Sequence, residues 1–328
     1  MIKHYHIHHG VQRTHKLRQF FIGFNCAILI GFGTPVLLNI LSAKEASSNN
    51  LTSQAAAWIH TDIETPKLNV PMPWPEYGYA AYGVPQRDLF ATSDDIKQPV
   101  PIASLAKVIT ALAVLKEKPL KTGEQGPALI LTEKDTALFN EYLNKNGVVV
   151  PVEVGEQISQ YQALQAMLLV SANNMSDSLA VWAFGSVDGY VKYANKMLKD
   201  TGLDNTVVAD ASGFSPNTVS TPEDMTKLGY LYMRSPVLRE IAMQEEANIP
   251  VAGIIRNANS FANENGIVGI KIGNTDEAGR TYMAARVQKV SESKEEISVA
   301  VVLGAKSLAA AAQDALAVLK AGSQDKRP

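Results

Sequence analysis

The segment from Pro101 to Leu115 constrains the fold more than any other part of the chain, because it reads as a helix that is apolar almost all round. Such a helix is buried on every side, so other elements must surround it. It nevertheless contains Lys107, and a buried amine costs free energy that calls for a reason. Ser104 lies three residues earlier, which places both side chains on one face with Cβ atoms about 5–6 Å apart. The segment therefore predicts a central helix carrying a serine–lysine pair.

This pair has a chemical interpretation and a structural one. Desolvation and the positive end of the helix both favour a neutral Lys107, which can take the proton from the Ser104 hydroxyl and make it a nucleophile. The chain has six histidines, none after His60, so a Ser-His-Asp triad in the main domain lacks its base. The structural interpretation is a plain N-cap at Ser104 and a lysine that extends to solvent.

Two other segments offer groups that would complete such a site. Ser171-Ala172-Asn173 joins two helical runs, where a serine can relay a proton and an amide can bond both a substrate carbonyl and a lysine. Alone, it also fits an ordinary helix-connecting turn. Residues 269–275 form an apolar strand interrupted by Lys271 and ended by Gly273. Lys271 would keep Lys107 neutral and anchor an anionic substrate, and Gly273 would let a substrate backbone approach closely; the alternative is a strand end with a solvated lysine.

The order of predicted elements favours an α+β fold. Capping signals at Ser159 and Thr221 introduce helices in the middle of the chain. The flanking elements are four strands and a closing helix, at Tyr77–Val84, Gly266–Gly273, Thr281–Val287, Ile297–Leu303 and Leu308–Leu319. One sheet would thus be built from both chain ends, with helices inserted between them. We expect this domain to occupy residues 71–320, followed by a tail at 321–328.

The N-terminal region predicts export. Residues 1–19 are basic and His-rich, and residues 20–41 are apolar over a length that can cross a bilayer. The excess of positive charge before this run orients its N-terminus to the cytoplasm. We expect a membrane anchor, with a cleaved signal peptide as the alternative, and either outcome places the main domain outside. Residues 42–70 then form a linker.

Composition excludes several classes of function. The chain has 30 Lys and Arg against 32 Asp and Glu over 328 residues, so no basic excess is present to bind nucleic acid. Its single cysteine, Cys26, excludes an intramolecular disulfide and a multi-cysteine zinc site.

Taken together, the three segments resemble the serine D-alanyl-D-alanine carboxypeptidases, the low-molecular-mass penicillin-binding proteins. Those proteins carry Ser-x-x-Lys, Ser-x-Asn and Lys-Thr-Gly in this order. Connecting segments are similar too, among them VPMPWPEYGYAAYGV, DASGFSPNTVSTPEDMTKLG and GIKIGNTDEAG. The resemblance runs from about Pro71 to Leu319. It implies a β-lactamase/transpeptidase-like fold, in which an antiparallel sheet from both chain ends holds an inserted helical subdomain.

The resemblance also implies a role for each candidate residue. Ser104 would attack the penultimate D-Ala carbonyl of a peptidoglycan stem peptide ending in D-Ala-D-Ala, with Lys107 as base. Ser171 would deliver the proton to the departing D-Ala, and Asn173 would orient the substrate amide and Lys107. The backbone N–H groups of Ser104 and Asn274 would form the oxyanion hole. The substrate would bind through Lys271, Gly273, Asn274 and Thr275.

It further implies β-lactams as inhibitors, no cofactor and no metal.

The third segment departs from the family pattern, since Ile272 stands where the family has threonine. In the family that hydroxyl binds the substrate's terminal carboxylate, and a hydrogen bond to a charged group contributes about 1.5–3 kcal/mol. Its loss would weaken the enzyme or shift its substrate, with Asn274, Thr275 or Arg280 as candidates to compensate. The alternatives are a weak or inactive wall-binding homologue and, less favoured, a β-lactamase. A β-lactamase of the common kind would need a deacylating glutamate soon after the second motif. The only Glu-x-x-Asn after Asn173 begins at Glu245, late in the chain.

Overall fold

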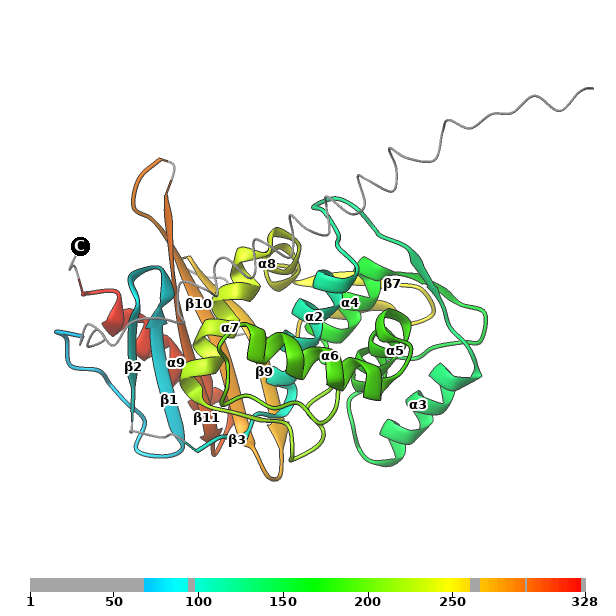
Figure 1. Cartoon of the computed structure of the whole chain (residues 1–328), viewed down its shortest axis with the longest axis horizontal. Coiled ribbons are helices and arrows are strands. Elements are labelled where there is room, and N and C mark those ends of the chain that lie inside the picture. The colour runs from blue at the N-terminus through cyan, green and yellow to red at the C-terminus, as the bar shows by residue number, and fades with distance from the viewer. Residues whose placement is uncertain (1–67, 94–97, 260–265, 293, 326–328) are drawn as a thin grey trace, which may run out of the picture. The chain divides into compact units, whose positions relative to one another are not determined.

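The computed structural model describes residues 68–93, 98–259, 266–292 and 294–325. The basic, His-rich residues 1–19, the apolar run 20–41 and nearly all of the predicted linker lie outside these ranges. Its centre is a five-stranded antiparallel sheet with the strand order β2-β1-β11-β10-β9 (Figure 1). The strands are β1 (Tyr79–Val84), β2 (Leu89–Thr92), β9 (Ile267–Thr275), β10 (Gly279–Lys289) and β11 (Glu295–Ala305). The predicted α+β sheet built from both chain ends is therefore confirmed.

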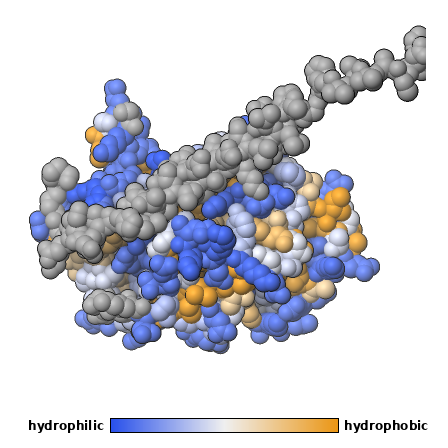
Figure 2. Space-filling view, viewed as in Figure 1, coloured by the Kyte–Doolittle hydropathy of each residue, from blue (hydrophilic) through white to orange (hydrophobic). Residues whose placement is uncertain are grey.

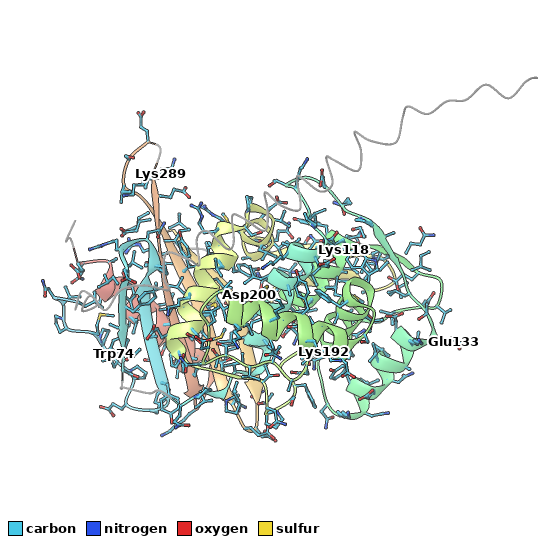
Figure 3. The ribbon with its side chains drawn as sticks, viewed as in Figure 1. Trp74, Lys118, Glu133, Lys192, Asp200 and Lys289 are labelled. Carbon is cyan, nitrogen blue, oxygen red and sulfur yellow. The ribbon has the colours of Figure 1, made fainter. Side chains whose placement is uncertain are left out.

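The two faces of the sheet enter different cores, because side chains alternate along each strand. Tyr282, Ala284 and Val302 pack on the side of α9 (Leu308–Gly322), together with the chain segment that contains Trp74. Neighbouring residues such as Met283 and Val301 face the larger, helical core. In Figure 3 Trp74 lies beside the β1–β2 edge, and Lys289 lies toward the tip of the β10–β11 hairpin.

The helices between β2 and β9 form the inserted subdomain, and α7 packs directly against the sheet. They are α2 (Ala106–Glu117), α3 (Glu133–Asn144), α4 (Gln160–Leu169), α5 (Asn173–Phe184), α6 (Val187–Asp200), α7 (Pro222–Arg234) and α8 (Pro236–Ala242). Short ribbons connect them: β3 (Val100–Pro101) with β6 (Val219–Ser220), β4 (Ala128–Ile130) with β5 (Gln157–Ser159), and β7 (Glu246–Ile249) with β8 (Gly253–Arg256).

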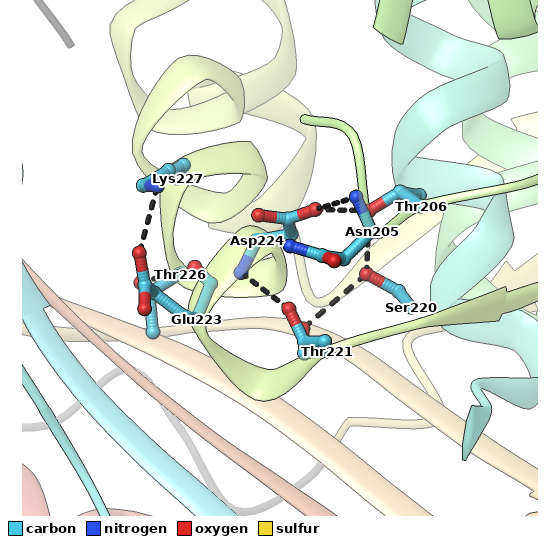
Figure 4. Close-up of polar contacts among 8 residues, drawn as sticks. All are labelled: Asn205, Thr206, Ser220, Thr221, Glu223, Asp224, Thr226 and Lys227. Atoms are coloured by element: carbon cyan, nitrogen blue, oxygen red, sulfur yellow. Dashed lines mark hydrogen bonds and ion pairs between the residues drawn. The ribbon is translucent and has the colours of Figure 1, made fainter. Parts of the chain in front are cut away.

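Side-chain caps explain where several of these helices begin, although α2 and α5 have none. Ser159 and Gln162 form the predicted capping box at the start of α4. At α7, the Thr221 hydroxyl accepts from the N–H of Asp224, and Pro222 occupies the first helical position (Figure 4). Asp224 itself accepts from Thr206 of the preceding loop. Each cap satisfies backbone groups that a helix start otherwise leaves unpaired.

Helix α2 lies in the middle of this subdomain, as its composition predicts. Every residue from Ala106 to Val114 is buried, including Lys107. Figure 2 shows that hydrophobic side chains on the viewed surface gather mainly over the helical part, whereas the β10–β11 hairpin is largely hydrophilic. The central position of α2 places its N-terminal end beside strand β9, where the predicted site residues lie.

Candidate active site

Ser104 occupies a short 3-10 turn, Ala103–Leu105, immediately before α2. The N-cap interpretation is wrong: Ser104 makes no side-chain capping bond, and the α2 N-cap position belongs to Leu105. Ala103 has a positive φ of 47°, an uncommon conformation for a residue with a Cβ. Gly213 packs so closely behind this turn that a Cβ there would lie 1.8 Å from the Ala103 carbonyl oxygen. The turn is thus held by its surroundings, and it presents the Ser104 hydroxyl to Lys107.

Lys107 does not extend to solvent, since its side chain is 0% exposed. Its Nζ lies 2.9 Å from Ser104 Oγ, 2.7 Å from Asn173 Oδ1 and 2.7 Å from the Ser212 carbonyl oxygen. A neutral amine has two N–H groups and one lone pair. Because Asn173 and Ser212 offer carbonyl oxygens that can only accept, the two N–H groups fit them, and the lone pair remains for the proton of Ser104.

Electrostatics favour this neutral form. Burial lowers the pKa of Lys107 to about 7, against an opposing effect of the carboxylates Asp210 and Asp177. A base with a pKa near neutrality is partly deprotonated at physiological pH and still accepts a proton readily. Ser104 and Lys107 together therefore have the geometry of a nucleophile and its base.

Ser171 and Asn173 lie at the junction that the sequence predicts, between the end of α4 and the start of α5. Ser171 has a φ of 68°, and Asn173 is the first residue of α5. The Asn173 N–H donates to the Val148 carbonyl at 2.7 Å, which holds the following helix against the loop after α3. The Asn173 side-chain oxygen is thereby aimed at Lys107.

Lys271 lies on β9 and is only 1% exposed, so the solvated-lysine interpretation is wrong. Its Nζ donates to the Ile272 carbonyl oxygen at 3.0 Å. Burial lowers the pKa of Lys271 well below its usual value, and the nearby Lys107 lowers it further. Two buried amines that share one site disfavour each other's protonation. Burial, rather than a neighbouring cation, is the main cause of the low pKa of Lys107.

Gly273 has a packing role in addition to the predicted one. A Cβ at this position would lie 2.4 Å from Thr281 Oγ1 and 2.9 Å from the Ser104 backbone nitrogen. The missing side chain therefore allows β9 to pack against the turn that carries Ser104. Gly273 also lines the pocket, and the close approach of a substrate there stays a prediction.

A pocket of about 290 Å³ opens over these groups. It is lined by most of the predicted residues, including Ser104, Ser171, Asn173, Gly273, Asn274 and Thr275, and also by Ile272 and Arg280. Thr275 Oγ1 accepts from the Ala278 N–H and so also closes the β9–β10 turn. Arg280 is the one charged residue among the described residues lining the pocket.

Sequence reasoning missed the loop that follows α6. The Asp210 side chain accepts hydrogen bonds from the Ser212 hydroxyl, the Phe214 N–H at 2.8 Å and the Thr218 hydroxyl at 2.5 Å. This folded loop presents the Ser212 carbonyl to Lys107. The available signal was the Asp-x-Ser-Gly pattern at its start, which is typical of a turn stabilised by a side chain.

Neither a bilayer-spanning helix nor a metal cluster is found in the described part of the chain. None of its helices combines the necessary length and apolarity for a span. No group of three or more His, Cys, Asp or Glu side chains within the described ranges is arranged around a common point for a metal. The predicted anchor at residues 20–41 lies outside those ranges.

The fold and the site define a protein in which a serine hydroxyl lies within hydrogen-bond distance of a buried lysine amine. A model of the D-alanyl-D-alanine carboxypeptidase family matches residues 90–307, and the chain belongs to this family. Among solved structures, a D-alanyl-D-alanine carboxypeptidase from Mycobacterium tuberculosis has the same fold, with a TM-score of 0.66 and 23% identity over 80% of this chain and 97% of the other. A Streptomyces DD-transpeptidase aligns with a TM-score of 0.68 and 18% identity over 78% of this chain and 100% of the other.

Curated relatives are similar over about half of their length. A D-alanyl-D-alanine endopeptidase of Pseudomonas aeruginosa is 32% identical over 55% of this chain and 57% of its own. A D-alanyl-D-alanine endopeptidase of Escherichia coli is 30% identical over 44% of each chain. A D-alanyl-D-alanine carboxypeptidase of Escherichia coli is 26% identical over 57% of this chain and 47% of its own.

Proposed function

We propose that this protein is a serine-type D-alanyl-D-alanine peptidase acting on peptidoglycan stem peptides, through an acyl-enzyme on Ser104. The observation that carries the proposal is the set of three contacts at Lys107 Nζ, which leaves its lone pair for the Ser104 proton. Family membership supports the reaction class, and it supports carboxypeptidase activity in particular. Export of the catalytic domain across the cytoplasmic membrane remains a prediction, in keeping with a substrate in the cell wall.

In the proposed acylation step, Ser104 Oγ bonds to the carbonyl carbon of the penultimate D-Ala while its proton passes to Lys107. The oxyanion receives hydrogen bonds from the backbone N–H groups of Ser104 and Asn274, since both residues line the pocket. The C–N bond then breaks, and the proton reaches the departing D-Ala amine through Ser171. Water subsequently attacks the ester and releases Ser104.

Lys271 contributes through its charge. An anionic substrate would favour the ammonium form of Lys271, and that charge in turn disfavours protonation of Lys107. Substrate binding would therefore favour a protonated Lys271 and a neutral Lys107, which is the form that can accept the Ser104 proton. The effect of Lys107 on the pKa of Lys271 supports a coupling between the two amines.

The nearest alternatives receive less support from the site. An inactive wall-binding homologue would not need a buried lysine kept in contact with Ser104, Asn173 and Ser212 at 2.7–2.9 Å. For a β-lactamase, Glu245 is exposed and does not line the pocket. Endopeptidase activity on cross-linked stem peptides is a second candidate, supported by the names of the Pseudomonas and Escherichia relatives.

Release of D-Ala and labelling by a fluorescent penicillin test the proposal together. We expect D-Ala release from a pentapeptide and a 1:1 penicillin adduct, located on Ser104 by mass spectrometry, with both lost in Ser104→Ala. Ser291→Ala is the matched control, because Ser291 starts another Ser-x-x-Lys in the β10–β11 hairpin, away from the pocket. An adduct that persists in Ser104→Ala would rule out this nucleophile. A cross-linked dimer as substrate distinguishes endopeptidase from carboxypeptidase activity.

Ile272→Thr is expected to raise the acylation rate on peptides ending in D-Ala-D-Ala by about 10- to 150-fold, the equivalent of one hydrogen bond to a carboxylate. Ile272 lines the pocket, so a hydroxyl there would face it. Ile272→Val is the matched control, because it keeps the β-branched shape without a donor. Single-turnover D-Ala release measures the effect. A rate that stays unchanged in both variants would show that position 272 does not contact the carboxylate, and would leave Arg280 as the anchoring group in this pocket.

A further inference from the structure

Asp177 is a buried acid beside the site that the mechanism above does not use. It lies on α5 one helical turn after Asn173, and the i, i+4 spacing puts both side chains on one face. Asp177 is only 7% exposed and does not line the pocket. Its Oδ1 atom is buried and has no hydrogen-bond partner among the described residues. Burying a carboxylate in this way is expensive, which calls for a functional explanation.

The other oxygen of Asp177 is held by Tyr142, which comes from α3. The Tyr142 hydroxyl donates to Asp177 Oδ2 at 2.8 Å and lies 3.3 Å from Ser212 Oγ. Ser212 is the residue whose carbonyl accepts from Lys107. The Tyr142 ring meets Phe214 edge-on, with ring centroids 5.6 Å apart, and Phe214 lines the pocket. The Tyr142 side chain thus contacts Asp177, the Ser212 residue that binds Lys107, and Phe214 in the pocket wall.

Asp177 acts on the base mainly through charge. The titratable groups that face it are Lys107 from α2, Tyr142 and Glu141 from α3, Tyr190 from α6 and Asp210 from the following loop. Burial raises the pKa of Asp177 to about 6, while the bond from Tyr142 opposes this shift. An ionised Asp177 favours the ammonium form of Lys107, and a protonated one does not.

Asp210 differs from Asp177 in having a structural use of its own. Its two oxygens accept from Ser212, Phe214, Ser215 and Thr218 and thereby fold the loop. Asp177 has only the Tyr142 bond and an unpartnered oxygen, so it is free to change its protonation without unfolding a loop.

We propose that Asp177, held by Tyr142, is a positioning residue that sets the protonation of Lys107 and so the pH range in which Ser104 is acylated. The inference rests on the proposed function, because it requires Lys107 to be the base. It adds two residues outside the three motifs, Tyr142 on α3 and Asp177 on α5, that would influence the protonation of Lys107.

The test is the pH profile of acylation by a fluorescent penicillin, from pH 5 to pH 9, for the wild type, Asp177→Asn and Tyr142→Phe. In the wild type we expect an acidic limb with a midpoint near the Lys107 pKa of about 7. Asp177→Asn removes the negative charge, so the midpoint should move to lower pH, by about half a unit or more. Tyr142→Phe keeps the ring but removes the donor; Asp177 then protonates more readily, and the midpoint should shift in the same direction by a smaller amount.

Asp224→Asn is the matched control, since Asp224 is also a buried acid, at the start of α7 (Figure 4). It is not among the groups that shift the Lys107 pKa. This substitution should lower the melting temperature and leave the midpoint in place. Midpoints of Asp177→Asn and Tyr142→Phe that coincide with the wild type, whatever their stabilities, would overturn the inference; if Asp177→Asn does not fold, Tyr142→Phe decides alone. Absence of labelling in the wild type would instead contradict the proposed function.

Discussion

Replacing Lys107 with methionine is expected to slow acylation of Ser104 by a penicillin by about 10³-fold or more, the range that a positioned general base contributes. Methionine fills the same buried volume but has no lone pair of sufficient basicity for the hydroxyl proton. The second-order rate constant of labelling by fluorescent penicillin measures the loss. Lys134→Met, at an exposed position on α3, is the control and should label at the wild-type rate. A near-normal rate in Lys107→Met would show that another group accepts the proton.

The same variant has a signature in the free energy of unfolding. The pKa of Lys107 is about 7 in the folded protein, against 10.5 for an unperturbed lysine. Between these values the unfolded chain holds a proton that the folded chain has lost. Because the unfolded state holds more protons between pH 7 and pH 10.5, the free energy of unfolding rises with pH over that range. Below about pH 7 the folded protein bears the full cost of a buried ammonium group.

Lys107→Met should reduce that slope by up to one proton, about 1.36 kcal/mol per pH unit. Urea unfolding from pH 7 to pH 9.5 measures the slope in the wild type and in the variant. An unchanged slope would mean that Lys107 stays charged in the folded protein.

Gly273→Ala is expected to destabilise the fold by about 2–4 kcal/mol and to reduce penicillin labelling by about 100-fold or more. The added Cβ would lie 2.4 Å from Thr281 Oγ1, 2.9 Å from the Ser104 nitrogen and 3.0 Å from Ala103 Cβ. Strand β9 must therefore move away from the nucleophile turn, which separates the two backbone N–H groups proposed to bind the oxyanion. Urea unfolding and labelling kinetics are the measurements.

A control variant and a double variant test this explanation of Gly273→Ala. Gly155→Ala adds a Cβ with nothing within 4 Å, so it should cost only the strain of its positive φ and leave labelling unchanged. Adding Thr281→Ala to Gly273→Ala removes the nearest clash and should restore part of the stability. Labelling should remain low, because the contact with the Ser104 nitrogen persists. Full recovery of labelling in the double variant would show that the position of β9 relative to Ser104 is not critical.

Much of the fold could be predicted because its signals are local. The apolar stretch of α2, the capping box at Ser159 and the apolar strands near the C-terminus each depend on residues close in sequence. The structure extends the strands, to Lys289 in β10 and Ala305 in β11, because neighbouring strands pair beyond the apolar residues that marked them. Helix α9 similarly continues to Gly322 rather than Leu319.

The site was predicted in part. Ser104, Lys107, Asn173 and Lys271 do converge, and the motif spacing was enough to select them. The Ser212 acceptor and the pair of Tyr142 and Asp177 were not found, because these partners are separated by 105 and 35 residues along the chain. No periodicity or short motif records a contact of that range.

By itself, the sequence determined the main helices and the long strands, that α2 would be buried, and which side chains are candidates for the chemistry, since each of these follows from local propensity, patterning and residue type. Only the tertiary structure decided the state of those side chains. The pKa of Lys107 is lowered because burial removes its water, and two carbonyl oxygens from distant segments lie within hydrogen-bond distance of its amine. A side chain at position 273 would collide with the Ser104 turn. Solvation and close packing depend on everything that surrounds a residue, and the surroundings exist only after the chain has folded.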